Sequence, residues 1–180
     1  RSKNLECVKF LAKNVAPITS ENLDKMLLHA SRAGHLRVVE YLWDTFDTLR
    51  TSTSEDRVSF SAATKGHLSL LHFAHARSFA VLFSPPNSAV QLMANACRGG
   101  HLHCVEYLYS LGHTADADIL SSAALSGCVP LVRFLLEHDC PTEPSTHIVY
   151  GLMRNNKMSF AEAKLFFQMG VPWDALTMVA

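Results

Sequence analysis

The sequence predicts an all-α solenoid of stacked helix pairs, and two observations carry this prediction. First, the segment Gly34–Leu42, a Gly-His-Leu triplet followed by Val-Glu-Tyr-Leu, returns almost unchanged at Gly100–Leu108. Weaker copies begin at Gly66 and Gly127, so the theme recurs about every thirty residues. Second, apolar residues within each copy are spaced three and four apart, which places them on one helix face. Repeats of this kind bury their apolar faces only against neighbouring repeats, which predicts about five to six stacked pairs.

Each unit is expected to contain a capped first helix, small residues near its end, a turn glycine and a more apolar second helix. In the first complete unit, Ser20-Glu21-Asn22 precedes an apolar face formed by Leu23, Met26, Leu27 and Ala30. The residues predicted to begin the later first helices as N-caps are Asp56, Ser88, Asp116 and Ser145. Small pairs such as Ala62-Ala63 let two antiparallel helices approach closely, and the glycine then reverses the chain in a left-handed conformation.

The repeat pattern divides one predicted domain, residues 1–180, into successive units. Degraded copies stand at both ends: Leu5–Leu11 opens the series, and Asn156 replaces the turn glycine in the last copy. Because the chain begins at Arg1 rather than Met, we expect an excised domain or a processed product. The approximate units are 1–19 (partial), 20–54, 55–86, 87–115, 116–143, 144–174 and 175–180 (partial).

Composition excludes several classes of protein. The 180 residues are 48% hydrophobic, enough for a normal core, and the formal net charge is +0. No global field therefore attracts nucleic acid or membrane surfaces, and no run of eighteen apolar residues predicts a membrane span. The five cysteines form no Cys-x-x-Cys pair, and Cys7 and Cys104 occupy the same repeat position. This pattern favours reduced, packed thiols in the cytoplasm or nucleus; a disulfide framework is the alternative.

The pattern small-small-x-x-Gly-His-x-x-x-Val-x-x-Leu resembles the ankyrin repeat over nearly the whole chain. The connectors Cys140-Pro141-Thr142-Glu143 and Val171-Pro172-Trp173-Asp174 are similar to those of the short, divergent ankyrin-like repeats of protists, oomycetes and large DNA viruses. The Thr-Pro-Leu-His start of the ankyrin first helix is absent, and short connectors imply short or missing β-hairpin fingers. The resemblance implies an adaptor or a parasite effector that binds a host protein inside the host cell. Tetratricopeptide or other helical repeats are the alternative fold.

Two connectors are longer than the others. The polar segment Thr45–Glu55 is interpreted as a solvated insertion or a functional loop. The segment Arg77–Asn87 contains Phe79-Ala80-Val81-Leu82-Phe83. This apolar segment either folds back onto its own repeat or exposes Phe79 and Phe83 as anchors for a partner.

No motif predicts catalysis or a cofactor. The sequence lacks a phosphate-binding glycine loop, a nucleophile elbow and a recognisable pair of catalytic acids. His35, His67 and His101 each follow a turn glycine, so the repeat itself accounts for them. A zinc site, the alternative, requires four convergent ligands. We therefore expect no enzyme, no metal and no cofactor.

A broken row of cations is the predicted partner site. Near the ends of the first helices stand Arg32, Lys65, Arg98 and Arg154, with His29 and Asn95 beside them. In ankyrin-like stacks this end lies on the concave binding face, which implies a basic ridge. The alternative is that these cations only complement the helix dipoles.

The sequence thus predicts a monomeric protein-interaction module that presents a rigid concave face to another protein. The alternative function is a phospho-ligand or nucleic-acid binder that uses the basic ridge. Bare nucleic acid is disfavoured because no aromatic ladder accompanies the cations.

Overall fold

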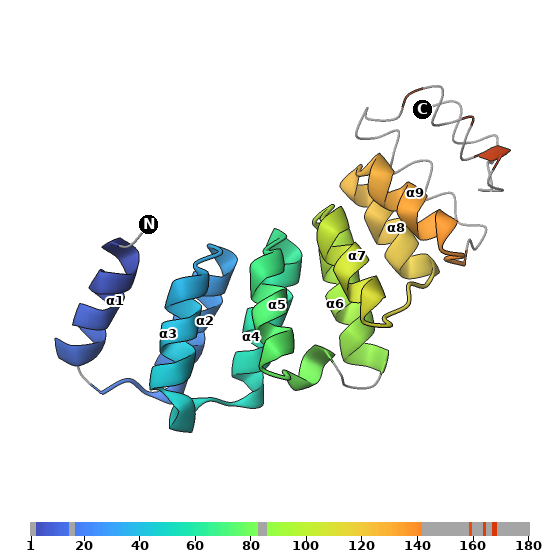
Figure 1. Ribbon diagram of the computed structural model, residues 1–180. Coiled ribbons are helices and arrows are strands. Elements are labelled where there is room, and N and C mark those ends of the chain that lie inside the picture. Colours follow the sequence, from blue (N-terminus) through green and yellow to red (C-terminus); the bar gives the residue numbers. More distant parts are fainter. Residues whose placement is uncertain are drawn as a thin grey trace. The chain divides into compact units, whose positions relative to one another are not determined.

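The computed structural model of the chain describes residues 3–14, 17–82, 86–141, 159, 164 and 167–168. Every regular element among these residues is a helix, so the predicted all-α class is confirmed for them (Figure 1). The chain divides into two compact units, Arg1–Ser84 and Pro85–Ala180, and each is described by itself.

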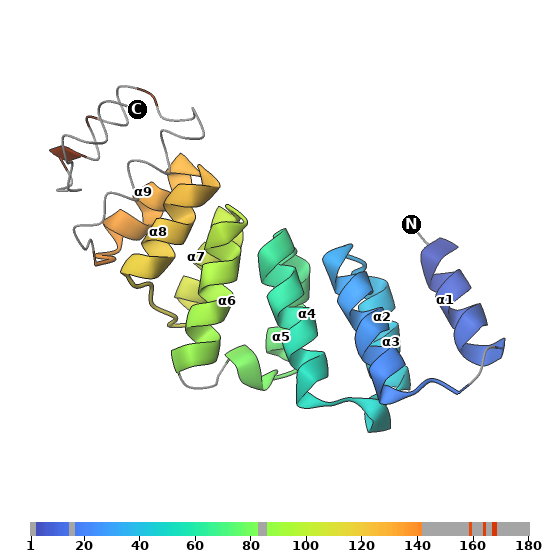
Figure 2. The same ribbon diagram turned by 180° about the vertical axis from the view of Figure 1, so that it is seen from behind.

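The first unit consists of one single helix followed by two helix pairs. Helices α2 and α4 pack side by side in one layer, with their pair partners α3 and α5 in the other (Figures 1 and 2). Helix α1 contacts α3. The bounds are α1 Lys3–Asn14, α2 Ser20–Arg32, α3 Leu36–Thr45, the 3₁₀ helix η1 Asp47–Leu49, α4 Ser52–Lys65, α5 Leu68–Ala76 and the 3₁₀ helix η2 Ala80–Leu82.

Small and apolar side chains form the contact between α2 and α4. Leu23 and Leu27 of α2 are fully buried, as are Val58, Ala62 and Ala63 of α4. Burial of a leucine side chain stabilises the folded chain by about 1.5–3 kcal/mol. The alanines keep the volume between the helices small, which allows close packing at interior density.

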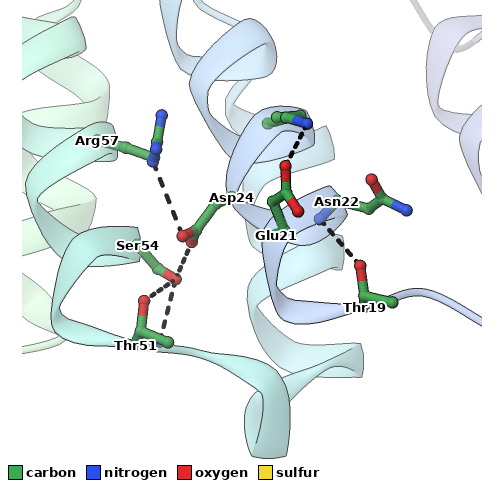
Figure 3. A network of polar contacts seen from close by, with 8 residues as sticks. Thr19, Glu21, Asn22, Asp24, Thr51, Ser54 and Arg57 are labelled. Carbon is green, nitrogen blue, oxygen red and sulfur yellow. Dashed lines mark hydrogen bonds and ion pairs between the residues drawn. The ribbon is translucent and has the colours of Figure 1, made fainter.

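One buried carboxylate joins the two helices (Figure 3). Ser54 Oγ accepts the backbone N–H of Thr51 at 3.1 Å and donates to Asp24 Oδ1 at 2.5 Å. The second carboxylate oxygen, Oδ2, lies 3.8 Å from Arg57 Nε. Asp24 is 8% exposed. Ser54 therefore stabilises the start of α4 and ties that start to α2 through the same hydroxyl group.

The turn between α2 and α3 packs against the turn between α4 and α5. Gly34 has a φ of +71°, and a Cβ placed there would lie 2.6 Å from His67 Cε1. His67 Nε2 lies 3.1 Å from the carbonyl oxygen of Arg32, which requires the proton on Nε2 for a hydrogen bond. This contact gives His67 the structural role that its position in the repeat predicts.

The connector after α5 folds back onto the first unit. The Phe79 ring packs against Trp43 at a centroid distance of 4.4 Å and against Phe73 at 5.9 Å. The Ala80 N–H donates to Glu55 Oε2 at 2.8 Å, and Arg77 Nη1 donates to Asp44 Oδ1 at 2.7 Å. Hydrophobic burial and polar contacts together hold residues 77–80 on the adjacent pair.

The described part of the second unit contains two further helix pairs, α6 with α7 and α8 with α9. As in the first unit, the first helices, α6 and α8, pack against each other. Cys140 Sγ lies 3.3 Å from the Asp116 carbonyl oxygen, and Tyr109 Oη donates to the His138 carbonyl at 3.1 Å. The bounds are α6 Pro86–Arg98, α7 Leu102–Ser110, α8 Ala117–Ser126 and α9 Val129–Glu137.

The same backbone hydrogen bond recurs at the ends of several helices. After three first helices, the N–H of the residue that follows the turn glycine bonds a carbonyl five residues back: His35 to Ala30, His67 to Ala62 and His101 to Ala96. Three second helices end with the same type of bond: Phe79 to Ala74, His113 to Leu108 and Cys140 to Leu135. These bonds supply donors to carbonyl oxygens that have no hydrogen-bond partner within the helix. The recurrence of the theme in sequence is therefore also a recurrence of local structure.

Two of the predicted helix starts are wrong. Helix α4 begins at Ser52 rather than Asp56, because Ser54 caps the Thr51 N–H, and α6 begins at Pro86 rather than Ser88. Proline favours the first helical position because its φ is already helical. The Asp116 cap is confirmed, since its Oδ1 accepts the N–H of Ile119 at 2.9 Å. Ser145 lies outside the described residues.

Removing the buried carboxylate should destabilise the first unit. We expect Asp24→Ala to lower the free energy of unfolding by about 1–3 kcal/mol, because Ser54 loses its hydrogen-bond acceptor and Arg57 loses its ion-pair partner. The matched control is Glu21→Ala on the same helix, whose 2.6 Å ion pair with Lys25 is exposed to solvent, so its removal should change the free energy of unfolding much less. Urea unfolding followed by circular dichroism measures both values; equal losses would contradict the role of Asp24.

Adding a methyl group at the first turn should also destabilise the fold. We expect Gly34→Ala to cost about 1–3 kcal/mol, from left-handed backbone strain and the contact with His67. Gly112→Ala is the control, because its φ is +89° but no atom lies within 4 Å of an added Cβ. In a His67→Ala background the cost of Gly34→Ala should fall toward that of the control. An unchanged cost would show that the imidazole does not restrict the turn.

Candidate partner-binding surface

An open, mainly apolar groove lies between α1 and the α2–α3 pair. Its volume is about 610 Å³. Apolar side chains from all three helices line it, among them Val8, Leu11, Met26, Val38 and Leu42. The groove exists because α1 packs against α3 while a space separates it from α2. An apolar depression of this size on ordered helices is a typical ligand or partner site.

The α1 side of the groove exposes a large apolar side chain. Leu11, which lines the groove, is 52% exposed. Its neighbour Phe10 is 66% exposed but is not among the residues that line the groove, because adjacent residues of a helix point in different directions. Burying Leu11 against an occupant of the groove would be favourable by about 25 cal/mol for each Å² removed from water.

Polar side chains of α2 border the opposite side. Asn22, Lys25 and His29 are exposed there, and His35 follows at the turn. Lys25 Nζ lies 2.6 Å from Glu21 Oε1, and the hydrogen bond from Lys25 lowers the pKa of Glu21. The Lys25 ammonium has three donors, so this exposed pair leaves capacity for a second acceptor.

Of the predicted partner residues that the structure describes, His29 alone lines this groove. Sequence reasoning missed the groove itself. It assigned Met26 to the same packing face as Leu23 and Leu27, but Leu23 and Leu27 are fully buried while Met26 is half-buried on the groove. An apolar stripe wider than one neighbouring helix can cover is the signal that could have revealed a second contact face.

The structure describes three of the four cations of the predicted basic ridge, two in the first unit and one in the second. Arg32 and Lys65 are exposed at the ends of α2 and α4, which run parallel. Arg98 is exposed at the end of α6 in the other unit, where its Nη1 donates to Asn95 Oδ1 at 3.4 Å. Arg154 lies outside the described residues. The ridge as a continuous surface stays a prediction.

The exposed-anchor interpretation of Phe79 is wrong. Phe79 is 1% exposed and belongs to the aromatic cluster with Trp43 and Phe73. Its burial follows from the α5 end, where the Phe79 N–H bonds the Ala74 carbonyl and turns the ring inward. The other interpretation of this connector, folding back onto its own repeat, agrees with the contacts to Phe73 and Glu55, while those to Trp43 and Asp44 extend to the preceding pair. Phe83 lies outside the described residues.

Among the residues that the structure describes, no three His, Cys, Asp or Glu side chains gather to hold a metal ion. Burial lowers the pKa of His113, which favours its neutral form. Within the same described ranges, each helix is too short or too polar to cross a membrane.

The cysteines are free thiols, and three of them are buried. Burial raises the pKa of Cys97 to about 12, with neighbouring Cys140 and Cys128 contributing. Burial also raises the pKa values of Cys104 and Cys140, each to about 11. Cys7, which the repeat aligns with Cys104, is exposed instead.

Neither a scan against protein-family models nor a search of curated proteins finds a match to the chain.

The thiols should differ strongly in their rate of alkylation. At pH 8 we expect iodoacetamide to modify Cys7 in the folded chain, whereas Cys97, Cys104 and Cys140 stay protected. A pKa raised from 9.0 to about 11 or 12 lowers the thiolate fraction about a hundred- to a thousandfold, and burial blocks access further. Peptide mass spectrometry after timed quenching gives the rates, and urea should abolish the difference. Equal rates at Cys7 and Cys97 without denaturant would contradict the packing.

Proposed function

We propose that the chain is an ankyrin-like helical-repeat solenoid that acts as a protein-interaction module of the adaptor or effector type and has no catalytic activity. The observation that carries the proposal is the open apolar groove of the first unit, held by three ordered helices. Its surface exists before a partner arrives, so binding loses little conformational entropy.

The repeated turns support the solenoid part of this proposal. The glycines Gly34, Gly66, Gly100 and Gly127 have φ values between +71° and +73°, and each separates a first helix from a second. First helices pack against first helices within each unit. Stacking of this kind extends a surface along the chain, which suits recognition of a macromolecule better than enclosure of a small substrate.

A phosphorylated or acidic ligand is the second candidate function. The observation that favours it is the exposure of Arg32 and Lys65 at the same end of two parallel helices. Guanidinium and ammonium groups in this arrangement suit spaced anionic groups. Binding by them would weaken steeply with salt, whereas binding in the apolar groove would weaken little.

The proposal is tested by capturing partners from a eukaryotic lysate and reconstituting the complex from purified components. We expect a defined stoichiometry by calorimetry and weak salt dependence if the groove dominates. The variant Arg32→Glu/Lys65→Glu/Arg98→Glu measures how much of the binding affinity depends on the basic ridge. Its matched control, Lys13→Glu/Arg37→Glu/Lys164→Glu, makes the same change in net charge at other exposed positions.

Circular dichroism checks that both variants are folded. If the first variant alone no longer binds a purified partner, the ridge is established as a binding surface. Retention in both variants would exclude the ridge and leave the groove as the site. If no protein binds with a defined stoichiometry under any condition, the proposed interaction function is overturned.

A further inference from the structure

Charged side chains in the two helix pairs of the first unit are sorted along the helix axes. Helices α2 and α4 run toward their turn glycines and α3 and α5 run back, so each pair has a turn end and a connector end (Figure 1). Residues 25–39 and 57–76, which surround the turns, contain no Asp or Glu. Glu40 stands midway along α3, and the other carboxylates of residues 20–76 lie toward the connector end: Glu21, Asp24, Asp44, Asp47, Glu55 and Asp56.

Ion pairs follow the same division. Within residues 20–77, every ion pair uses a carboxylate of the connector end, and the cations in these pairs are Lys25, Arg50, Arg57 and Arg77. The other three lysines and arginines of this segment form no ion pair there and are exposed beside the turns. Arg32 ends α2, Lys65 ends α4, and Arg37 is the second residue of α3. We call these three cations the turn patch.

The turn patch is one surface because the two turns contact each other. His67 Nε2 lies 3.1 Å from the carbonyl oxygen of Arg32, and the His67 ring lies against Gly34. Packed helices are about 8–10 Å apart, so the helix ends that carry Arg32 and Lys65 are separated by about this distance. The patch is therefore a row of separate cations and not one convergent cluster.

Helix dipoles account for two of these cations but not for Arg37. Arg32 and Lys65 stand at helix C-termini, where a positive charge is favourable. Arg37 stands in the first turn of α3, where the dipole disfavours a cation and no acidic residue offsets it. Glu40, three residues later, forms no ion pair with Arg37. The hydrogen bond to Asp44 raises the pKa of Arg77, and the charge of Glu40 adds to that effect.

We propose that the turn patch binds an extended acidic segment of a partner protein, with Asp or Glu side chains about three residues apart. The inference rests on the proposed interaction function and names a surface and a ligand chemistry for it. An exposed cation that its own helix disfavours, in a region without carboxylates, suits an anion from outside the chain. Arg37 distinguishes this surface from the basic ridge, which does not include it.

The spacing of the cations favours carboxylates along an extended chain over other anions. Such a chain advances about 3.3–3.6 Å per residue, so three residues span the distance between the ends of α2 and α4. A single phosphate group needs donors that converge on it, and the turn patch does not supply them. Single-stranded nucleic acid is disfavoured because no Phe, Tyr or Trp of α2 to α5 is exposed for base stacking.

The probe for the test is a fluorescent peptide of Gly and Ser with a Glu at every third position. The matched peptide carries Gln in place of each Glu. Fluorescence anisotropy measures the binding of both peptides to the full chain. We expect saturable binding of the Glu peptide alone, weakened about tenfold between about 20 mM and about 200 mM salt, because salt screens exposed charges.

Variants of the full chain define the surface. Arg37→Glu and Lys65→Glu should each weaken the Glu peptide about fivefold or more, whereas Arg37→Lys, which keeps the charge, should retain most of the binding. Lys13→Glu makes the same change in charge at an exposed position near the end of α1 and should weaken binding less than about twofold. Circular dichroism checks that each variant is folded.

Salt-sensitive binding that Arg37→Glu and Lys65→Glu weaken, and that Lys13→Glu does not, supports the proposal. Absence of saturation up to about 1 mM of the Glu peptide at low salt overturns it, as do equal binding of the Gln peptide and binding that Arg37→Glu leaves unchanged. An oligonucleotide that binds more tightly than the Glu peptide and is lost in the same variants assigns the patch to nucleic acid, and overturns it. Self-association at low salt that Arg37→Glu abolishes assigns the patch to the acidic connector end of a second copy, and also overturns it.

A purified partner separates this proposal from the interaction function. If the partner uses the turn patch, both triple variants lose it, because Arg32→Glu/Lys65→Glu/Arg98→Glu and Lys13→Glu/Arg37→Glu/Lys164→Glu each reverse a charge of the patch. The single variant Arg37→Glu then accounts for the loss in the second. A partner lost in the first triple variant alone, or retained in both, overturns the turn patch while the interaction function stands.

Discussion

The contact between the parallel first helices α2 and α4 is the constraint on which the rest of the first unit depends. Alanines allow the two helices to approach closely, and Asp24 at their contact is only 8% exposed. Its carboxylate is stabilised by the hydrogen bond from Ser54 and the ion pair with Arg57. Because Ser54 also caps the start of α4, the position of α4 along its axis is linked to its contact with α2. Packing, capping and charge pairing thus specify one arrangement of the two helices.

The same contact explains why the surface of the first unit is uneven. A first helix has two sides that other first helices can cover, and α2 uses one of them for α4. Its other side combines apolar Met26 with polar Asn22 and Lys25 along the groove. The groove combines apolar area with a polar border, as the centre and rim of a protein interface do.

The fold could be predicted from sequence where one local pattern decided the structure. The Gly-His-Leu theme located four turns, and apolar spacing located both helices of each described pair. Helix starts were predicted less well. At α4 the contact between Ser54 and Thr51 decides the start, and not the nearby Asp56; at α6 the backbone is helical from Pro86, two residues before Ser88. Phe79 could not be placed from sequence, since its burial depends on Trp43, a residue far away in the chain. The groove was missed for the same reason: a repeat pattern describes what each unit shares with its neighbours, and a binding site arises where one unit differs.

The bonds that end the second helices show how little the turn depends on residue type. Phe79, His113 and Cys140 make the same backbone bond although their side chains have nothing in common. The left-handed residue before each of them also varies, as Ser78, Gly112 and Asp139. The turn therefore requires a main-chain conformation and not one shared residue. Two segments of this chain can differ in every side chain at these positions and still end their helices with the same hydrogen bond.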